Sequence, residues 1–362
     1  MKKIIFALVF LSMQVTAASW YVRVGGSGDT LTTFQEALDS LKADDSVYVN
    51  GDAVFEVGAC LIADMNGGAN PIAKDSTSIY IVGCEPDWTP YTDTLAMVKC
   101  SVTVALDSML SIVGANTSNL IFSNFWFYGT DQCGVGVYTG EDVSDITFKR
   151  CKFSGFTGRI LNVRAPASNG QSWKIISCSF YGGSDGVYSP STNRAQFNIY
   201  FSHFDGMTGV AIETSSGVST EVIGNTIANV GTGIYIPYSS TANGTTILNN
   251  GILHARYGLD IVQNAPFELQ IHNNSFQDCD TAVFTHNTNA AKYYQWISYN
   301  NYYGNTADCD INGSSPLGEY NMAVDPKYTD TTAATINMVK DSTSSLFGAG
   351  VFNPHIKELG GE

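Results

Sequence analysis

The feature that most constrains this chain is a repeat of about 25 residues. Eight copies of an eight-residue block follow one another, from FSNFWFYG (122–129) to ISYNNYYG (297–304), and successive blocks begin 23 to 27 residues apart. The sixth residue of each block is large and apolar or aromatic: Phe127, Phe153, Phe180, Phe204, Ile227, Ile252, Phe276 and Tyr302. A fixed period of this length indicates a repeat architecture, in which each unit buries its apolar face by stacking on the next.

Each repeat has the pattern of short strands. The fourth and sixth residues of a block share one face of an extended chain, because side chains alternate along a strand. A second strand follows several residues later, as in GVAIE (209–213), GIYIP (233–237) and GLDIV (258–262). With turn residues such as Gly, Asn and Ser at the corners and no helical periodicity, the pattern predicts an all-β chain that coils on itself as a parallel β-solenoid.

The fourth position of the block predicts a polar ladder inside the coil. Four successive copies have Asn there: Asn225, Asn250, Asn274 and Asn300. Stacked strands lie about 4.8 Å apart, so each amide can donate a hydrogen bond to the next, which offsets the cost of burying it. Two earlier copies have Cys151 and Cys178 at this position. The same stacking allows either a disulfide between them or two packed free thiols.

The N-terminal segment predicts export. Residues 1–18 contain Lys2 and Lys3, an apolar run and then small residues, as in a secretory signal peptide cleaved near Ala17 or Ala18. The mature protein is therefore expected to be secreted or extracytoplasmic. No later run is apolar for the roughly 20 residues that a membrane helix needs, so no membrane span is expected in the mature chain.

Residues 19–55 predict a strand, an amphipathic helix and the first coil. Residues 56–320 then form the solenoid, and residues 321–362 form a C-terminal cap or tail. On the helix, Phe34, Leu38 and Leu41 share one face, which would cover the open end of the core.

The sequence as a whole resembles the right-handed parallel β-helix family, the pectate-lyase-like superfold. The coils carry its N-x-I/F and G-I-x-I patterns, and the N-terminal region has a T-x-x-E-A-L helix followed by D-x-V-Y-V. AVDPKYTD (323–330) and STSSLFGAG (342–350) are similar to its closing segments, although Ser345 and Leu346 replace the usual Pro and Ala. The resemblance implies a single-stranded right-handed β-helix of about 10–12 coils with an N-terminal capping helix.

Many enzymes with this fold act on acidic polysaccharides, but their motifs are not complete here. The N-T-D and G-H-G blocks of polygalacturonases are absent, and the one D-D pair belongs to the N-terminal cap. The pectate-lyase motif R-x-P-x-x-R is matched only in part, from Arg164 to Asn169, with Asn at the second Arg. The resemblance leaves calcium open as a cofactor, whereas the spacing of His and acidic residues predicts no metal site.

Charge suggests a first candidate surface. A net charge of −15 argues against nucleic acid as a partner. Seven basic residues nevertheless fall within 46 positions: Lys149, Arg150, Lys152, Arg159, Arg164, Lys174 and Arg194. Because a lyase needs a base and a cation that neutralises the uronate carboxylate, Arg159 and Arg164 are the catalytic candidates, and Lys149, Lys152 and Arg194 are candidates for substrate binding. The alternative is that all are solvated charges balanced by nearby aspartates.

The second strands suggest another surface. If they align, their outward residues are Tyr188, Ala211, Tyr235, Asp260 and Phe284, with Glu213 and His286 one step further along. Aromatic rings beside carboxylates suit sugars, which place their apolar faces on rings and their hydroxyls on polar groups. The three aromatic residues and Asp260 are therefore candidates for substrate binding. The alternative is an exposed β-face that favours Tyr and Phe by propensity alone.

These observations lead to one hypothesis and one alternative from a different class. The hypothesis is a secreted or surface-exposed β-helix protein that binds polysaccharide or a cell-surface glycan. Whether it also cleaves the glycan, as a lyase on acidic glycans or as a glycoside hydrolase, stays open, because fold alone does not assign activity. The alternative is a non-catalytic adhesin, envelope component or phage-spike-type structural β-helix. The oligomeric state is left open as well.

Overall fold

The computed structural model describes most of the repeat region and parts of both ends. The described residues are 19–22, 31–39, 46–50, 55–57, 60–62, 79–84, 95–100, 106–113, 119–140, 143, 145–164, 171–189, 195–214, 219–237, 244–262, 269–286, 297–311 and 321–326. The predicted signal peptide 1–18, the candidate Arg194 and most of the predicted C-terminal cap lie outside them. No helix of the described residues is long and apolar enough to cross a membrane.

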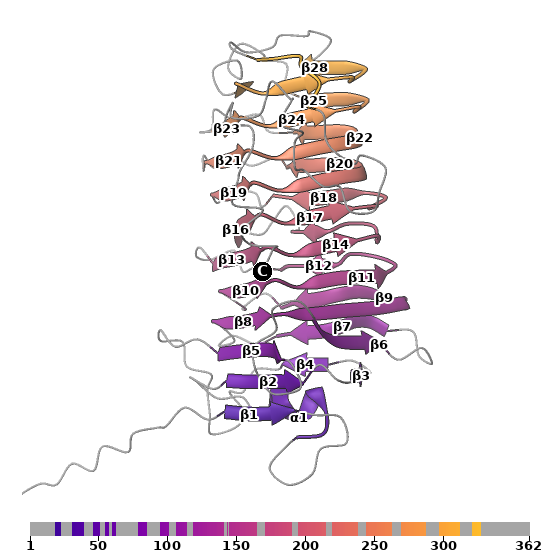
Figure 1. Ribbon diagram of the computed structural model, residues 1–362, viewed down its shortest axis with the longest axis vertical. Coiled ribbons are helices and arrows are strands. Elements are labelled where there is room, and N and C mark those ends of the chain that lie inside the picture. The colour runs from indigo at the N-terminus through magenta and orange to yellow at the C-terminus, as the bar shows by residue number, and fades with distance from the viewer. Residues whose placement is uncertain are drawn as a thin grey trace, which may run out of the picture.

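Figure 1 shows one elongated stack of short strands, with β1 at one end and β28 at the other. Eleven strands form a parallel sheet in this order: β1 (Ser19–Val22), β2 (Ser46–Asn50), β5 (Ile79–Cys84), β8 (Leu120–Ser123), β10 (Ile146–Lys149), β13 (Gln171–Ile176), β16 (Ala195–Tyr200), β19 (Thr220–Ile223), β21 (Thr245–Leu248), β23 (Leu269–His272) and β26 (Ile297–Ser298). Neighbours in this sheet come from successive turns of the chain, as in a solenoid.

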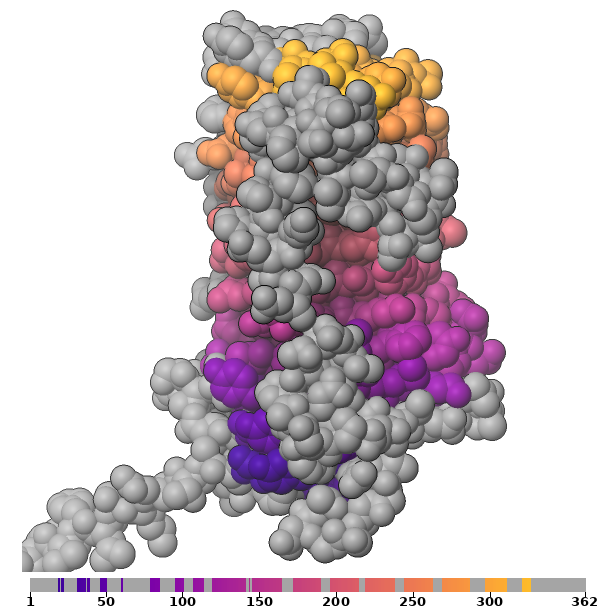
Figure 2. Space-filling model, in the orientation of Figure 1, coloured from indigo at the N-terminus to yellow at the C-terminus, as the bar shows by residue number. Residues whose placement is uncertain are grey.

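The remaining strands lie opposite this sheet and also pair in parallel from turn to turn. They are β3 (Phe55–Val57), β4 (Cys60–Ile62), β6 (Ala96–Cys100), β7 (Leu106–Ile112), β9 (Phe125–Thr139), β11 (Lys152–Phe156), β12 (Leu161–Asn162), β14 (Ser179–Tyr181), β15 (Val187–Tyr188), β17 (His203–Asp205), β18 (Val210–Glu213), β20 (Thr226–Ile236), β22 (Gly251–Ile261), β24 (Ser275–Gln277), β25 (Thr281–Thr285), β27 (Asn301–Tyr303) and β28 (Ala307–Ile311). The space-filling view has the same elongated shape (Figure 2). The predicted all-β parallel solenoid is therefore confirmed.

The sixth residues of the repeat form the centre of the core. In register, Phe127, Phe153, Phe180 and Phe204 are fully buried, and their rings stack at centroid distances of 5.1, 4.9 and 4.6 Å. The interplanar angles fall from 13° to 1° along this row. Such stacked pairs add roughly 0.5–1.5 kcal/mol each to the gain from burying their area.

The predicted amide ladder is present. Asn250 Nδ2 donates to Asn274 Oδ1 at 2.9 Å and to the Val222 carbonyl at 2.8 Å. Its own Oδ1 accepts from the backbone N–H and the amide of Asn225, at 2.9 and 3.0 Å. The ladder continues beyond the four predicted residues, because Asn321 accepts from the Asn300 backbone N–H at 2.7 Å. Every rung thus satisfies buried polar groups of its neighbours.

At the two cysteines that precede the ladder, both thiols are free and buried. The Cys151 backbone N–H donates to Cys178 Sγ at 3.4 Å, and Cys178 N–H donates to Ser202 Oγ at 3.1 Å. Burial raises the pKa of the Cys178 thiol. Of the two arrangements that the sequence allowed, the structure has the packed thiols.

The N-terminal helix is short. The helix α1 (Phe34–Asp39) has six residues and begins with a capping box, because Thr33 Oγ1 accepts from Glu36 N–H at 3.1 Å while the Glu36 carboxylate accepts from Thr33 N–H at 3.1 Å. Phe34 and Leu38 are buried, and the Phe34 ring lies 5.9 Å from that of Phe125. The role of this helix as a cap and the number of coils stay predictions.

Breaking one rung of the ladder should destabilise the fold. In Asn250→Ala, the buried Val222 carbonyl and Asn225 N–H each lose a partner, which typically costs about 1–3 kcal/mol per group. We expect the free energy of unfolding in urea to fall by about 2–5 kcal/mol.

A matched control is Gln270→Ala, on the neighbouring strand β23, because the Gln270 side chain is exposed. Its free energy of unfolding should stay within about 0.5 kcal/mol of the wild type. Equal losses in the two variants would show that the ladder contributes nothing to stability.

Candidate functional site

One outward row of side chains crosses successive turns on the second strands. Tyr138, Asn162 and Tyr188 are in register on β9, β12 and β15. Glu213, Tyr235, Asp260 and Phe284 are in register on β18, β20, β22 and β25. The two runs meet at Tyr188 and Glu213, because the residues just before them, Val187 and Ile212, pair. We call these seven residues the lateral column.

The column corrects one sequence-based assignment. The prediction of Ala211 in this row was wrong, since Ala211 is fully buried and Glu213 is the residue in register with Tyr235. The cause is the alignment of β18: Ile212, and not Val210, pairs with Ile234. A shift of two residues keeps the same face of the strand but changes which side chain stands at each level.

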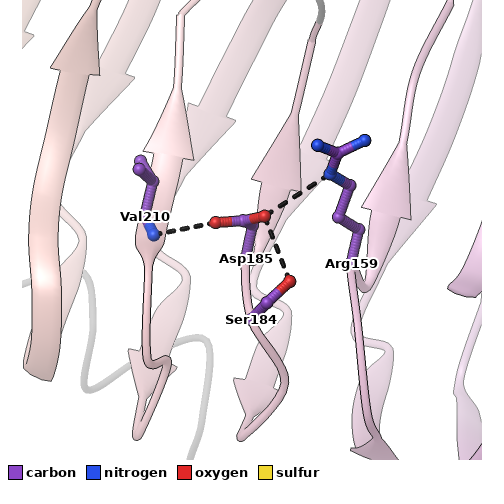
Figure 3. Close-up of polar contacts among 4 residues, drawn as sticks. All are labelled: Arg159, Ser184, Asp185 and Val210. Carbon is purple, nitrogen blue, oxygen red and sulfur yellow. Dashed lines mark hydrogen bonds and ion pairs between the residues drawn. The ribbon is translucent and has the colours of Figure 1, made fainter. Parts of the chain in front are cut away.

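The ion pair of Arg159 with Asp185, drawn in Figure 3, lies beside the middle of the column, because Arg159 contacts Tyr188. Arg159 Nε is 3.4 Å from Asp185 Oδ2, and the guanidinium carbon of Arg159 is 3.4 Å from the centroid of the Tyr188 ring. Asp185 is itself fixed, because its Oδ1 accepts from Val210 N–H at 2.9 Å and Ser184 donates to its Oδ2 at 3.1 Å. The cation is therefore held on a carboxylate and an aromatic face.

Gly209 makes room for this carboxylate. A Cβ atom at position 209 would lie 2.5 Å from Asp185 Oδ1 and 2.9 Å from the Ser184 carbonyl oxygen. Neither distance is compatible with normal packing, so a side chain at position 209 would push Asp185 away from Arg159. The absence of a side chain at this position is part of what positions the ion pair.

Glu213 is the ionisable group of the column with the most altered acidity. Its side chain is buried, and this burial raises its pKa to about 7, with Asp185 adding to the rise and Arg159 opposing it. At neutral pH, the protonated and ionised forms of Glu213 therefore coexist. A carboxyl group in this state can both accept and donate a proton, as a general base or acid must.

The C-terminal end of the column carries a second ionisable pair. Asp260 Oδ1 lies 3.0 Å from His286 Nε2, and burial raises the pKa of Asp260 against the opposing effects of His286 and Arg256. Burial, followed by the charges of Asp260 and Glu213, raises the pKa of the Tyr235 phenol. Two carboxyl groups thus flank a tyrosine that stays protonated at neutral pH.

The structure separates the predicted basic residues. Arg159 lies at Tyr188, and the Arg164 guanidinium carbon is 5.7 Å from the Tyr138 ring centroid, so both arginines approach the lateral column. Lys152 lies on β11, over a different aromatic surface, and Lys149 is exposed at the end of β10 in the eleven-stranded sheet. The lysines therefore do not join the arginines, and Arg194 is outside the described residues.

Sequence reasoning missed Asp185 as part of the site and treated it as a balancing surface charge. The available signal was its place in the repeat, just before the second strand, where its carbonyl accepts from the N–H of Ile160, the residue after Arg159, at 2.8 Å. Among the described residues, no group of three or more His, Cys, Asp or Glu side chains gathers as metal ligands would.

Comparisons with known proteins agree with this architecture. Residues 166–321 match the family model described as right handed beta helix region. The crystal structure of alginate lyase from Paenibacillus sp. str. FPU-7 is similar with a TM-score of 0.50 and 14% identity, over 80% of this chain and 94% of that chain. The right-handed parallel β-helix that the sequence resemblance implied is therefore confirmed.

Other similar structures have lower scores. The Dettilon tailspike protein (gp208) has a TM-score of 0.44 and 12% identity, over 84% of this chain and 68% of that chain. Pectin methylesterase from carrot has a TM-score of 0.34 and 12% identity, over 87% and 91%. The search of curated proteins found no match.

The raised pKa of Glu213 predicts a pH-dependent stability. The folded state favours the protonated form, so the contribution of this group is complete below about pH 4.5 and is lost as the pH rises through about 7. One pKa unit corresponds to about 1.4 kcal/mol. Over this pH range, the free energy of unfolding of the wild type should therefore fall by up to about 3 kcal/mol more than that of Glu213→Gln.

Urea unfolding of the two proteins at about pH 4 and about pH 8 tests this prediction. The other ionisable groups are the same in both proteins, so their contributions cancel when the two free energies of unfolding are subtracted at each pH. Parallel pH profiles would contradict the prediction and show that Glu213 titrates alike in the folded and unfolded chain.

Proposed function

We propose that the chain binds an acidic polysaccharide along the lateral column and cleaves it there as a lyase. The observation that carries the proposal is Glu213, a buried carboxyl group with a pKa of about 7, whose acidity is affected by the Arg159–Asp185 ion pair. Tyr188 on one side of it and Tyr235 on the other supply aromatic surfaces for sugar rings. The relatedness of folds supports only the scaffold, and the chemistry rests on these residues.

The structure favours a different division of roles from the one that the sequence indicated. Arginine keeps its proton in proteins, and Arg159 is further held on Asp185 and Tyr188. We therefore assign Arg159 to neutralising the carboxylate of a uronate sugar, and Glu213 to moving the proton. Arg164, which lies over Tyr138 two levels from Tyr188, is assigned to binding another sugar of the same polymer.

The reaction would be a β-elimination. Ionised Glu213 takes the proton from the ring carbon that bears the sugar carboxylate, while Arg159 stabilises the charge that develops on that carboxylate. The bond from the adjacent ring carbon to the glycosidic oxygen breaks, and a double bond forms between the two carbons. The Tyr235 hydroxyl, which its raised pKa keeps protonated, supplies the proton to the leaving oxygen. After the product leaves, Glu213 releases the abstracted proton to solvent and Tyr235 recovers a proton from solvent, which restores both groups.

The proposal also covers the place of action. The predicted signal peptide, residues 1–18, would deliver the chain out of the cytoplasm, where structural polysaccharides are found. The regular spacing of the column suits an extended polymer, because successive levels are about 4.8 Å apart and a sugar ring spans roughly one level.

Replacing the proton-transfer group tests the reaction. With a panel of uronate polysaccharides, we expect the wild type to form unsaturated products that absorb ultraviolet light. Glu213→Gln keeps the shape of the side chain but cannot accept a proton, so kcat should fall by roughly 10²–10⁴-fold with KM little changed.

The matched control is Glu221→Gln on β19, in the eleven-stranded sheet, which should retain wild-type kcat. If new reducing ends form without ultraviolet absorbance, the reaction at this site is hydrolysis and not elimination. Binding without any product would favour the non-catalytic adhesin or spike. If Glu213→Gln has the same kcat as the wild type, Glu213 does not transfer the proton.

A further inference from the structure

A second aromatic surface lies on β9, β11 and β14, separate from the strands β12, β15 and β18 that carry the middle of the lateral column. Trp126 is in register with Lys152, and Tyr128 is in register with Ser154 and Tyr181. All five side chains are half-buried, on the outward face of strands whose alternate residues, Phe127, Phe153 and Phe180, are in the core. The surface spans three consecutive turns.

A lysine occupies the middle of this surface. The Lys152 ammonium lies 4.2 Å from the centroid of the Trp126 ring and 5.4 Å from that of Tyr181. The ion pairs among the described residues are those of Arg159 with Asp185 and of Asp260 with His286, so no described carboxylate neutralises Lys152. On a chain with a net charge of −15, this is a local cation held by aromatic faces.

Neighbouring groups fix the rings around the lysine. Trp126 Nε1 donates to Ser154 Oγ at 2.8 Å, and the Tyr128 ring lies 5.6 Å from the Trp126 ring. Gly155, with φ of 69°, leaves space beneath Tyr128, because a Cβ there would lie 2.6 Å from that ring. The aromatic side chains therefore have set positions before any ligand arrives, which lowers the entropic cost of binding.

We propose that Trp126, Tyr128, Lys152 and Tyr181 form a binding surface for an anionic sugar unit, independent of the lateral column. The Lys152 ammonium pairs with the carboxylate or sulfate of the sugar, and the apolar face of the sugar packs on the aromatic side chains beside it. Because Lys152 makes no ion pair with a described carboxylate, its ammonium favours an anionic glycan over a neutral one, while the Asp205 carboxylate, in register with Tyr181, bounds the surface on the next turn.

Titration calorimetry with short anionic oligosaccharides tests the surface. The probes are an oligogalacturonate and a heparin-derived oligosaccharide, with methyl-esterified oligogalacturonate as the uncharged counterpart. We expect the charged probes to bind and the esterified probe to bind at least about tenfold more weakly. Trp126→Ala and Lys152→Gln should each weaken binding by about tenfold or more, as for a central aromatic or cationic anchor.

Lys174→Gln is the matched control, because Lys174 is an exposed lysine on β13 in the eleven-stranded sheet. This variant should bind the charged oligosaccharides with the affinity of the wild type. Lys152→Gln removes the charge but keeps a flexible polar side chain that is only one atom shorter, so its circular dichroism and unfolding should match the wild type. If neither charged probe binds, or if Trp126→Ala and Lys152→Gln both bind like the wild type, the proposal is overturned.

The same titrations separate this proposal from the proposed lyase. If both are right, an oligouronate occupies two sites per chain in the wild type and one in Trp126→Ala, and Glu213→Gln loses product formation while keeping the Lys152-dependent site. If only the second surface exists, no product forms and the single site is lost in Trp126→Ala. If only the lyase exists, product forms and binding is indifferent to Trp126 and Lys152.

Discussion

The parallel register between successive turns is the constraint on which the rest of this structure depends. The inward face enforces it, because stacked phenylalanines allow small slips whereas the amide ladder does not. Asn250 satisfies a carbonyl and a backbone N–H of the turn before it, so moving it by one residue would leave several buried groups without partners. Polar groups inside the coil thus specify alignment more sharply than the apolar core around them.

The outward face inherits that alignment. Alternation along each strand means that once Ile212 and Ile234 are paired in the core, Glu213 and Tyr235 must stand side by side outside it. The site is therefore a consequence of core packing, and its members come from turns that are about 25 residues apart in the chain. This arrangement also explains why no short catalytic motif exists to be found: neighbours in the column are never neighbours in sequence.

The sequence predicts the repeated parts of the molecule well and the individual parts poorly. The period, the buried sixth residue and the asparagine ladder each recur in several copies of the repeat, so they can be recognised even where one copy is irregular. Ala211 was misplaced because β18 begins with an additional apolar residue, Val210, that imitates the start of the neighbouring strands. Asp185 and the high pKa of Glu213 depend on burial and on contacts between turns, which a single sequence does not display.

The two aromatic surfaces differ in one respect that separates their chemistry. Both hold a cation over a ring, Arg159 over Tyr188 and Lys152 over Trp126. Arg159 also has a carboxylate partner, Asp185, so its guanidinium is fixed in place, which suits the role proposed for it in orienting and neutralising a uronate carboxylate. Lys152 has no such partner among the described residues, and its full charge is available to a ligand. The two proposals therefore differ in what they ask of the cation: Arg159 is held in one position by Asp185 and Tyr188, whereas Lys152 is held by aromatic rings without an ion pair among the described residues.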